Sequence, residues 1–573
     1  MADKTGAQHI VSILEELGVD NVFGYTGGSI VSVFDALGKS SITLTINSNE
    51  QSAAFSAGGY SRTTDKVGVA IVTSGPAITN ALTAIADCYT DSVPLLVFSG
   101  QVPEHKLGTD AFQHVDVESV CRGVVKRVIR CTAADLQRQI RDAYHFARSG
   151  KPGPVVLDLP VNVQNAVIAE DGADPEVFVC KYQPHHVPSQ SQCEEFFVHL
   201  KKAQRPLLYI GGGANNERAS QALRAFQEKF SVPFVHTLMG NGVIDGTRKE
   251  CLGMLGMFGT PAANTAIQES DFFIAIGVRW DDRVSEKVGQ FGAKAEIAYV
   301  DINPEKVQQI REERGPVFSF CGDAGDVIET LAESHEAFDS SSSQWHARVQ
   351  ELNTYFPLAY KKSSDRIQQA HVLDILSQKI RNHDVRVATG VGNHQMLSAQ
   401  YLRMRSPRRF ATSGSFGTMG FGMPTAVGIA RAHPESMTIV VDGDGSFRMN
   451  MGELHTILQY DLPVKILLLN NHGDGMVRNL QNVLYGEGTG VHTGTTRPKD
   501  VDFAQVAAIM GFAFAERVTD PADLDKAVSR FLDASTPAFL EVITDPDEAV
   551  YPKVAPGQHY SEMQLGPFIR WLK

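Results

Sequence analysis

The sequence predicts an α/β protein with three doubly wound domains, each built on a parallel sheet. Short continuous apolar runs alternate with longer segments that carry apolar side chains at helical spacing. This pattern is typical of parallel strands that are covered by helices on both faces. The chain has 573 residues, which is too many for one hydrophobic core, so about three domains of ordinary size are expected.

The first predicted domain covers residues 1–168. It begins with an amphipathic helix at residues 7–17, and residues 22–24 form a short strand that runs into a glycine turn. Three further apolar runs are strand-sized and bounded by turn residues: 67–72, 94–98 and 154–159.

The second predicted domain covers residues 190–338, and its sheet begins with the apolar run at 206–210. The polar segments on either side of it are expected to be linkers: 169–190 and 339–343. The third predicted domain covers residues 366–550. A tail at 551–573 is rich in proline, glycine and aromatic residues and is expected to fold over a site.

Composition excludes several classes of protein. The net charge is −13 and there is no long basic run, so nucleic acid is not an expected partner. The longest apolar runs are strand-sized, so no membrane span is expected. Seven cysteines without a C-x-x-C pair form no recognisable zinc site or disulfide framework. Because the N-terminus also lacks a signal or transit pattern, we expect a cytoplasmic protein.

A pattern suited to metal binding follows two predicted strands of the third domain. One apolar strand ends in Asp442-Gly443-Asp444-Gly445, and the apolar run at 465–469 ends in Asn470-Asn471. Carboxylate and amide oxygens are hard ligands that suit Mg²⁺ or Ca²⁺. Open α/β sheets bind ligands at the carboxyl ends of their strands, so we expect Asp444 and Asn471 to lie near one ligand site.

Other motifs explain these residues less well. An EF-hand would place Asp442, Asp444 and Glu453 at positions 1, 3 and 12, but its sixth position requires glycine and is Phe447 here. A solvated turn explains the Asp-Gly-Asp-Gly run alone, but not the asparagine pair after the second strand. Elsewhere, a P-loop ending at residues 38–40 fails because its first glycine is replaced by a valine.

The metal pattern resembles the Gly-Asp-Gly…Asn-Asn motif of thiamine diphosphate enzymes. Nearly the whole chain resembles the catalytic subunit of acetohydroxyacid synthase (acetolactate synthase). The resemblance rests on the order and spacing of these strings: Thr73-Ser74-Gly75-Pro76, Gly100-Gln101-Val102-Pro103, Gly108-Thr109-Asp110-Ala111-Phe112-Gln113, Gly253-Met254-Leu255-Gly256-Met257, Asp281-Asp282-Arg283-Val284 and Met419-Gly420-Phe421-Gly422.

The resemblance implies that the three domains bind, in order, the pyrimidine of the cofactor, FAD and the diphosphate. Glu50 would bind the aminopyrimidine and move the proton that activates the cofactor. In this family that glutamate acts on cofactor held by the partner subunit, so a homodimer or homotetramer is expected. A separate regulatory subunit is left open.

The resemblance also implies the ligands of each cofactor. Mg²⁺ would bind Asp444, the side chain of Asn471 and the backbone carbonyl of Gly473, and Met419 would hold thiamine diphosphate in its bent shape. Further residues would surround this cofactor: Gly392, Asn393, His394, Gln395, Gly443, Gly445, Ser446 and Met476. FAD would contact residues of the second domain: Thr237, Leu238, Met239, Gly277, Arg279, Asp301 and Asp323. By themselves, Met419 and His394 would more often be structural residues.

The activity implied by the resemblance is decarboxylation of a 2-oxo acid such as pyruvate. The hydroxyethyl unit that remains is then ligated to a second 2-oxo acid, giving 2-acetolactate or a related 2-hydroxy-3-oxo acid. Gly27 and Gly28 would offer amides to the developing oxyanion, and Phe112 and Gln113 would line the site. Arg283 would bind the acceptor carboxylate, although a surface arginine paired with Asp281 or Asp282 is the alternative.

Several positions depart from the family pattern. Thr26 stands where the family usually has proline, Asn49 where it has histidine, and Ala77-Ile78 where it has Gly-Ala. Val161 replaces a lysine, Phe258 replaces a histidine and Leu480 replaces a tryptophan. Together they suggest an altered acceptor or a specialised pathway, which stays open beside the branched-chain amino acid biosynthesis that the resemblance implies. Loss of the tryptophan wall at Leu480 is expected to weaken discrimination between pyruvate and 2-oxobutyrate.

Three alternatives remain open at this point. A 2-oxo acid decarboxylase would release an aldehyde instead of ligating the two-carbon unit. A flavin-linked oxidase would pass electrons to FAD. A non-catalytic chain would only bind nucleotide or serve as a scaffold, but the presence of Glu50, Asp444 and Asn471 argues against that role.

Overall fold

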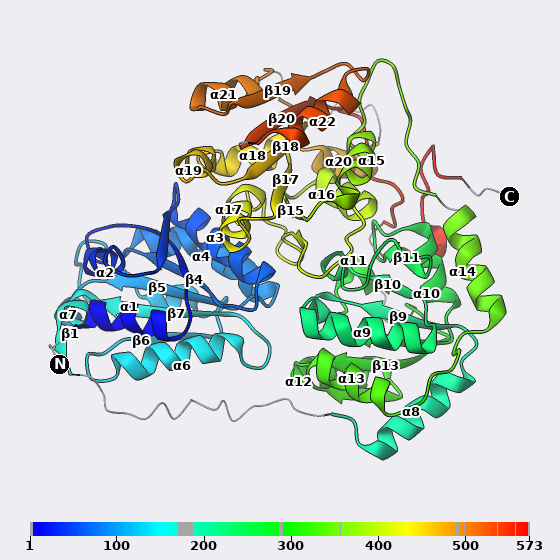
Figure 1. Ribbon diagram of the computed structural model, residues 1–573, viewed down its shortest axis with the longest axis horizontal. Coiled ribbons are helices and arrows are strands. Elements are labelled where there is room, and N and C mark those ends of the chain that lie inside the picture. Colours follow the sequence, from blue (N-terminus) through cyan, green and yellow to red (C-terminus); the bar gives the residue numbers. More distant parts are fainter. Residues whose placement is uncertain are drawn as a thin grey trace.

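The computed structural model describes residues 4–169, 187–285, 290–355, 357–486, 492–497, 499–535, 537–555 and 557–570. These residues form three six-stranded sheets, and every neighbouring pair of strands within them is parallel. Helices flank each sheet, and the three units lie around a common centre (Figure 1). The predicted α/β class with three doubly wound domains is confirmed. Most of the first predicted linker, residues 170–186, lies outside the described residues.

The sheet of the first domain has the strand order β3-β2-β4-β5-β7-β6. Its strands are β2 (Asn21–Tyr25), β3 (Thr43–Ile46), β4 (Gly68–Val72), β5 (Leu95–Gln101), β6 (Arg127–Arg130) and β7 (Pro154–Pro160). Its helices are α1 (Gly6–Glu16), α2 (Val31–Leu37), α3 (Glu50–Thr63), α4 (Pro76–Thr90), α5 (Val117–Cys121), α6 (Leu136–Arg148) and α7 (Val161–Asn165). Strands β1 (Lys4–Thr5) and β8 (Val167–Ile168) pair antiparallel beside it.

Burial explains why the strands of this sheet could be recognised in the sequence. Every residue of β4, β5 and β7 is buried, because helices cover both faces of the sheet. The helix α1 buries only one face, as its amphipathic spacing predicted.

The sheet of the second domain has the strand order β11-β10-β9-β12-β13-β14. Its strands are β9 (Pro206–Ile210), β10 (Phe234–His236), β11 (Cys251–Met254), β12 (Phe272–Ile276), β13 (Glu296–Asp301) and β14 (Phe318–Cys321). Its helices are α8 (Gln190–Lys202), α9 (Glu217–Phe230), α10 (Pro261–Glu269), α11 (Asp282–Ser285), α12 (Pro304–Arg314), α13 (Ala324–Glu333) and α14 (Ser343–Tyr355). Counted from β9, this is the 3-2-1-4-5-6 order of dinucleotide-binding sheets.

The segment 339–343, predicted to be a linker, packs against the second domain. Ser340 is buried and its hydroxyl donates to the carbonyl of Phe230 at 2.6 Å. The helix α14 that follows buries Trp345, whose indole N–H donates to the carbonyl of Pro206 at 2.9 Å. Through these contacts, residues 339–343 and α14 pack against the second domain.

The sheet of the third domain has the strand order β16-β15-β17-β18-β20-β19. Its strands are β15 (Val385–Thr389), β16 (Phe410–Ala411), β17 (Met437–Gly443), β18 (Val464–Asn470), β19 (Phe514–Val518) and β20 (Ala538–Ile543). Its helices are α15 (Gln369–Lys379), α16 (Asn393–Tyr401), α17 (Gly422–Ala432), α18 (Asp444–Phe447), α19 (Glu453–Gln459), α20 (Gly475–Tyr485), α21 (Phe503–Met510) and α22 (Leu524–Asp533).

The first and third domains share one hydrophobic core, in which α3 packs across α17 (Figure 1). Phe55 of α3 meets Phe421 edge-on, with ring centroids 5.4 Å apart. The helices approach closely because small residues lie at the crossing. A Cβ on Gly428 would lie only 1.9 Å from the carbonyl oxygen of Ser56. These contacts fix the position of the first domain relative to the third.

The tail returns from the third domain to the second (Figure 1). The Val554 N–H donates to the carbonyl of Met257 at 2.8 Å, and the Tyr560 hydroxyl donates to the carbonyl of Val284. Among the described residues, no helix is both long and apolar enough to cross a membrane. Five cysteines in the described part of the chain are free and buried: Cys88, Cys121, Cys131, Cys193 and Cys251.

Candidate active site

The predicted metal residues lie at the carboxyl edge of the third sheet. Asp444 begins α18 directly after β17, and Asn471 follows the last residue of β18. The two strands are neighbours in the sheet, so their ends meet at the same edge. Both side chains are buried, with Asp444 2% and Asn471 4% exposed.

Three oxygen acceptors converge at this edge. The amide of Asn471 turns its oxygen toward Oδ1 of Asp444, 3.1 Å away, and toward the carbonyl oxygen of Gly473, 2.7 Å away. The carboxylate of Asp444, the side-chain amide of Asn471 and the carbonyl of Gly473 thus lie within reach of one another, and their oxygens are the kind of ligand that suits Mg²⁺. Among the described residues, no group of three His, Cys, Asp or Glu side chains could hold a metal, so this site depends on amide and carbonyl oxygens beside Asp444.

An arginine that sequence reasoning missed lies beside these oxygens. Nη1 of Arg497 donates to Oδ2 of Asp444 at 2.5 Å, and Nη2 donates to Oδ1 of Asp474 at 2.7 Å. Burial raises the pKa of Asp444 above its usual value, and Arg497 opposes that rise. Arg497 lies 53 residues from Asp444 in the sequence, so no local pattern pointed to it.

Residues at the start of α16 bring unsatisfied polar atoms to the same edge. The buried atoms Oδ1 of Asn393, Nε2 of His394 and Oδ2 of Asp442 have no hydrogen-bond partner. His394 Nε2 lies 3.4 Å from Oδ1 of Asp442. Buried polar atoms normally have hydrogen-bond partners, so these three unpartnered atoms are consistent with a site where a polar ligand binds. By contrast, Gln395 uses its amide to bind Thr412 at 2.7 Å.

Met419 lies in a loop that is held at both ends. Before it, the Thr418 hydroxyl donates to Oδ2 of Asp87 at 3.0 Å. After it, the Gly420 N–H donates to the hydroxyl oxygen of Ser446 at 2.9 Å, and the Gly420 carbonyl accepts from Asn450 at 2.8 Å. The loop therefore ties Met419 to α4 of the first domain on one side and to the turn after β17 on the other.

A buried ion triad in the first domain supports this loop. Arg62 binds Asp87 at 2.6 Å and Asp91 at 2.9 Å, and the side chain of Arg62 is only 6% exposed. Asp91 in turn accepts hydrogen bonds from the N–H groups of Gly414 and Ser415. Burial raises the pKa of Asp87 to about 6, against the opposing effect of Arg62.

Glu50 is the first residue of α3 and is half-buried. Its Oε2 accepts a hydrogen bond from the side chain of Asn80 on α4 at 2.6 Å. Asn49, which replaces the histidine usual at this position, caps the helix by accepting from the Ser52 N–H at 2.8 Å. Among the described residues of one chain, Glu50 makes no hydrogen bond or ion pair with Asp444 or Met419.

The other predicted residues of the first domain lie on loops at the carboxyl edge of its sheet. Gly27 follows β2, and a Cβ there would touch the side chain of Thr73, which follows β4. Gln113 has a left-handed backbone, with φ of 59°, and lies against Gly75. Such strain in a residue other than glycine is often found at functional sites. Gly28 is open to solvent, and Phe112 is 87% exposed.

The predicted FAD residues also follow the ends of parallel strands. Thr237 follows β10, Gly277 follows β12 and Asp301 ends β13. The backbone at Gly277 has φ of 60° and passes so close to Gly213 that a Cβ would lie 2.7 Å from its Cα. This contact joins the loops after β9 and β12, where the strand order reverses. The buried hydroxyl of Thr237 has no partner, which fits a bound ligand at this edge.

The other residues predicted to contact FAD have partners within the chain. Asp301 accepts from the Asn303 N–H at 2.8 Å and from the Tyr299 hydroxyl at 3.0 Å, and burial raises its pKa. Asp323 caps α13, and Arg279 forms an ion pair with Asp281 at 3.1 Å. Leu238 and Met239 belong to the turn after β10.

Comparison with known proteins identifies the family. Models of the thiamine pyrophosphate enzymes match in order: the N-terminal TPP binding domain over residues 4–120, the central domain over 193–331 and the C-terminal TPP binding domain over 390–542. Acetolactate synthase 1 of Nicotiana tabacum is 36% identical over 576 residues, covering 98% of this chain and 85% of that protein. The chain belongs to the acetolactate synthase family of thiamine pyrophosphate enzymes.

Bacterial members of the acetolactate synthase family are equally similar. The acetolactate synthase of Arthrospira platensis is 38% identical over 576 residues, covering 98% of this chain and 97% of that protein. The acetolactate synthase isozyme 2 large subunit of Escherichia coli is 37% identical over 559 residues, covering 97% of this chain and 99% of that protein. The predicted resemblance is thereby confirmed, and thiamine pyrophosphate is another name for thiamine diphosphate.

Two of the positions that depart from the acetolactate synthase pattern are core residues. Ala77 and Ile78 are 1% and 0% exposed within α4, so they alter packing rather than line a pocket in this chain. The hypothesis that all these substitutions surround one pocket is wrong for this pair. Leu480 is different, because it lies on α20 and is 49% exposed. Met476 lies one turn earlier on the same helix and is half-buried.

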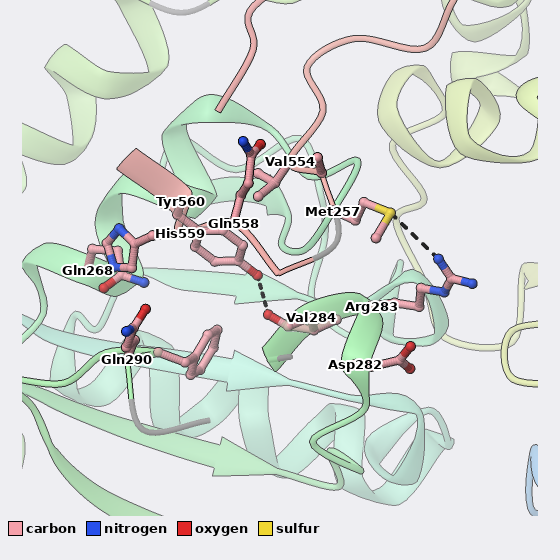
Figure 2. Close-up of a pocket in the computed structure, with 12 residues that line it drawn as sticks. Met257, Gln268, Asp282, Arg283, Val284, Gln290, Val554, Gln558, His559 and Tyr560 are labelled. Carbon is pink, nitrogen blue, oxygen red and sulfur yellow. Dashed lines mark hydrogen bonds between the residues drawn. The ribbon is translucent and has the colours of Figure 1, made fainter. Parts of the chain in front are cut away.

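Arg283 of this acetolactate synthase family member has no acidic partner among the described residues. Its guanidinium points to the sulfur of Met257, at 3.7 Å (Figure 2). Asp281 forms its ion pair with Arg279 instead, at 3.1 Å. The alternative that Arg283 is a paired surface arginine is therefore not supported. A cavity of about 40 Å³ lies beside it, between α11 and the tail, with Tyr560 on its wall.

Proposed function

We propose that this protein decarboxylates pyruvate and ligates the two-carbon unit to a second 2-oxo acid, giving 2-acetolactate when the acceptor is pyruvate and a related 2-hydroxy-3-oxo acid otherwise. The observation that carries the proposal is the convergence of Asp444, Asn471 and Gly473 at the carboxyl edge of the third sheet. Similarity to acetolactate synthases over nearly the whole chain supports the same activity. The family membership also argues against a non-catalytic scaffold.

Mg²⁺ is the proposed metal of the third domain. Asp444, Asn471 and the Gly473 carbonyl would hold it against the diphosphate of the cofactor, and the orphan atoms of Asn393 and His394 would face the same group. When bound, thiamine diphosphate supplies a thiazolium carbon that stabilises negative charge next to a carbonyl. Met419 would support the cofactor from the loop anchored at Asp87 and Ser446.

Glu50 is the proposed proton carrier. It would hold and move a proton at the aminopyrimidine, and Asn80 would keep its carboxylate in place. In this family the glutamate acts on cofactor held by the partner subunit, so a homodimer is the proposed minimum active unit. Two chains would then pair the first domain of one with the third domain of the other. The relative from Escherichia coli is named a large subunit, so a separate regulatory subunit is compatible with this assembly.

FAD is the proposed ligand of the second domain. The support is the dinucleotide-binding strand order, the meeting of the β9 and β12 loops, and the unpartnered hydroxyl of Thr237. Purified protein with the absorbance of bound flavin would support this assignment. A flavin that bleaches on addition of pyruvate would instead favour the oxidase alternative.

Arg283 is the proposed binding residue for the acceptor carboxylate. Its guanidinium has no acidic partner in the described part of the chain, and a planar fork of donors suits a carboxylate. Leu480, exposed on α20, would give the acceptor less contact than the family tryptophan. We expect weaker discrimination between pyruvate and 2-oxobutyrate, and a strong 2-oxobutyrate preference in a competition assay would contradict this.

Product analysis tests the proposed function directly. The purified protein would be incubated with pyruvate, thiamine diphosphate, Mg²⁺ and FAD. Acetolactate as the main product is the expected result. Acetaldehyde as the main product would replace the proposal with a 2-oxo acid decarboxylase, and absence of pyruvate turnover would require another substrate. A cytoplasmic location stays a prediction from the cysteine pattern.

A further inference from the structure

The two oxygens of the Asp444 carboxylate have different surroundings. Oδ1 faces the amide of Asn471, while Oδ2 accepts a hydrogen bond from Nη1 of Arg497 at 2.5 Å. The carboxylate is 98% buried by side-chain area, so neither oxygen has ready access to solvent. The oxygen that faces the proposed metal site and the oxygen that faces the guanidinium are therefore distinct.

Arg497 is held in place by its main chain as well as its side chain. Its N–H donates to the carbonyl of His472 at 2.9 Å, and the Asp474 N–H donates to the carbonyl of Thr495 at 2.9 Å. Its second guanidinium nitrogen binds Asp474 at 2.7 Å. These bonds attach Arg497 to the loop that carries the Gly473 carbonyl, so Arg497 is held in a fixed position relative to this proposed metal ligand.

The Arg497–Asp474 pair also packs on the turn after Asp444. A Cβ on Gly445 would lie 2.1 Å from Oδ1 of Asp474 and 3.0 Å from Nη2 of Arg497. Glycine at this position lets the ion pair approach the backbone beside Asp444, from where Arg497 reaches Oδ2 of that carboxylate. The side chain of Arg497 is 22% exposed, so the contact is shielded from bulk water.

Mg²⁺ and Ca²⁺ use carboxylates differently. Mg²⁺ requires near-octahedral coordination by single oxygens, whereas Ca²⁺ takes about six to eight oxygens and accepts both oxygens of one carboxylate. We propose that Arg497 selects Mg²⁺ over Ca²⁺ by occupying Oδ2 of Asp444, which leaves only Oδ1 for the cation. Arg497 is thus a positioning residue, and the inference rests on the metal site of the proposed function.

Binding of thiamine diphosphate in each cation measures this selectivity without enzyme turnover. The full-length protein would be freed of cations with a chelator and titrated with thiamine diphosphate by calorimetry, in saturating Mg²⁺ or in saturating Ca²⁺. In Arg497→Met, the affinity with Mg²⁺ is expected to fall by about 10–100-fold, the range for loss of an outer-shell partner. The affinity with Ca²⁺ falls less, so the ratio of the two affinities drops by about 10-fold.

Three further variants sharpen the test. Arg497→Lys keeps the charge but not the fork, and is expected to give an intermediate ratio. Asp474→Asn weakens the second contact of Arg497 and should lower the ratio slightly. Arg366→Met removes an arginine from an exposed ion pair with Asp545 in the same domain, and should leave the ratio unchanged.

The outcomes separate this inference from the proposed metal site. If thiamine diphosphate binds with both cations and the ratio in Arg497→Met equals that of the native chain, Arg497 does not select the cation, although the metal site stands. If the native chain binds thiamine diphosphate equally well without either cation, both proposals fail. If Arg497→Met does not fold by circular dichroism, an unchanged ratio in both Arg497→Lys and Asp474→Asn overturns the inference.

Discussion

The first and third domains have sheets of the same topology but carry different chemistry. When each sheet is numbered from its own first strand, both have the order 2-1-3-4-6-5. The strand pairs β4–β5 and β17–β18 occupy equivalent central positions. In the first domain β4 is followed by Thr73 and Ser74, and in the third β17 is followed by Asp444.

The two domains also use equivalent helices to contact each other. Helix α3 follows β3, helix α17 follows β16, and both strands are the edge neighbours of the first strand in their sheets. Glu50 begins α3, and Met419 lies just before α17. The two domains therefore share one architecture because their apolar patterns are similar, whereas the short polar loops at their strand ends differ and give each domain a different function.

Replacing Glu50 by Gln tests the task of the first domain, with the largest expected effect. The amide keeps the shape of the side chain but cannot carry the proton, so turnover of pyruvate should fall by about 10²–10⁴-fold. Binding of thiamine diphosphate, measured by calorimetry, should be kept. Glu118→Gln on the exposed face of α5 is the matched control. Native turnover in Glu50→Gln would remove Glu50 from the mechanism.

Replacing Arg62 by Met tests how the two domains are joined. The change leaves Asp87 and Asp91 buried without their counter-charge, which is expected to lower the free energy of unfolding by about 3–5 kcal/mol. Urea denaturation followed by fluorescence and circular dichroism measures this. Arg366→Met, in an exposed pair, should change stability by less than about 1 kcal/mol. Equal stability of the two variants would show that the triad does not stabilise the junction.

Replacing Asp444 by Asn tests the task of the third domain. The loss of one negative charge at the metal site should weaken binding of thiamine diphosphate in Mg²⁺ by about 100-fold, at the upper end of the effects seen for outer-shell partners. Calorimetry with saturating Mg²⁺ gives the affinity. Asp461→Asn, on the loop before β18, serves as a control for charge alone. Unchanged affinity for thiamine diphosphate in Asp444→Asn would show that the cation binds elsewhere in the protein.

Replacing Gly428 by Ala probes the crossing of α3 and α17, with the smallest expected effect. The new Cβ would lie 1.9 Å from the Ser56 carbonyl oxygen, so the helices must separate, at about 1–3 kcal/mol. Thermal denaturation measures the loss. Gly123→Ala, where a Cβ has open space, should be close to neutral. If the two alanine variants have the same melting temperature, the close approach of the helices adds nothing to stability.

The sequence predicted those features that depend on local pattern. The strand at 206–210 coincides with β9, and the predicted strands at 67–72 and 154–159 match β4 and β7 within two residues. They were recognisable because helices cover both faces of each sheet, which requires continuous apolar runs. The positions of Asp444 and Asn471 at neighbouring strand ends followed from the same pattern, and their role as metal ligands stays a proposal.

Features formed by distant residues could not be predicted in this way. Nothing near Arg497 or Asp474 distinguishes their charges from those of a solvated loop, yet they meet over Gly445. Ala77 and Ile78 were interpreted as pocket positions from the family pattern, and only their burial in α4 shows that they belong to the core.

By itself, the sequence determined the α/β class, the three sheets and the family, because periodicity and motif spacing are properties of short stretches of chain. Only the tertiary structure decided how Arg62 joins the first domain to the loop before Met419, and which oxygen of Asp444 faces Arg497. Those contacts link residues far apart in the sequence, and their geometry is set by packing of whole domains rather than by any local preference.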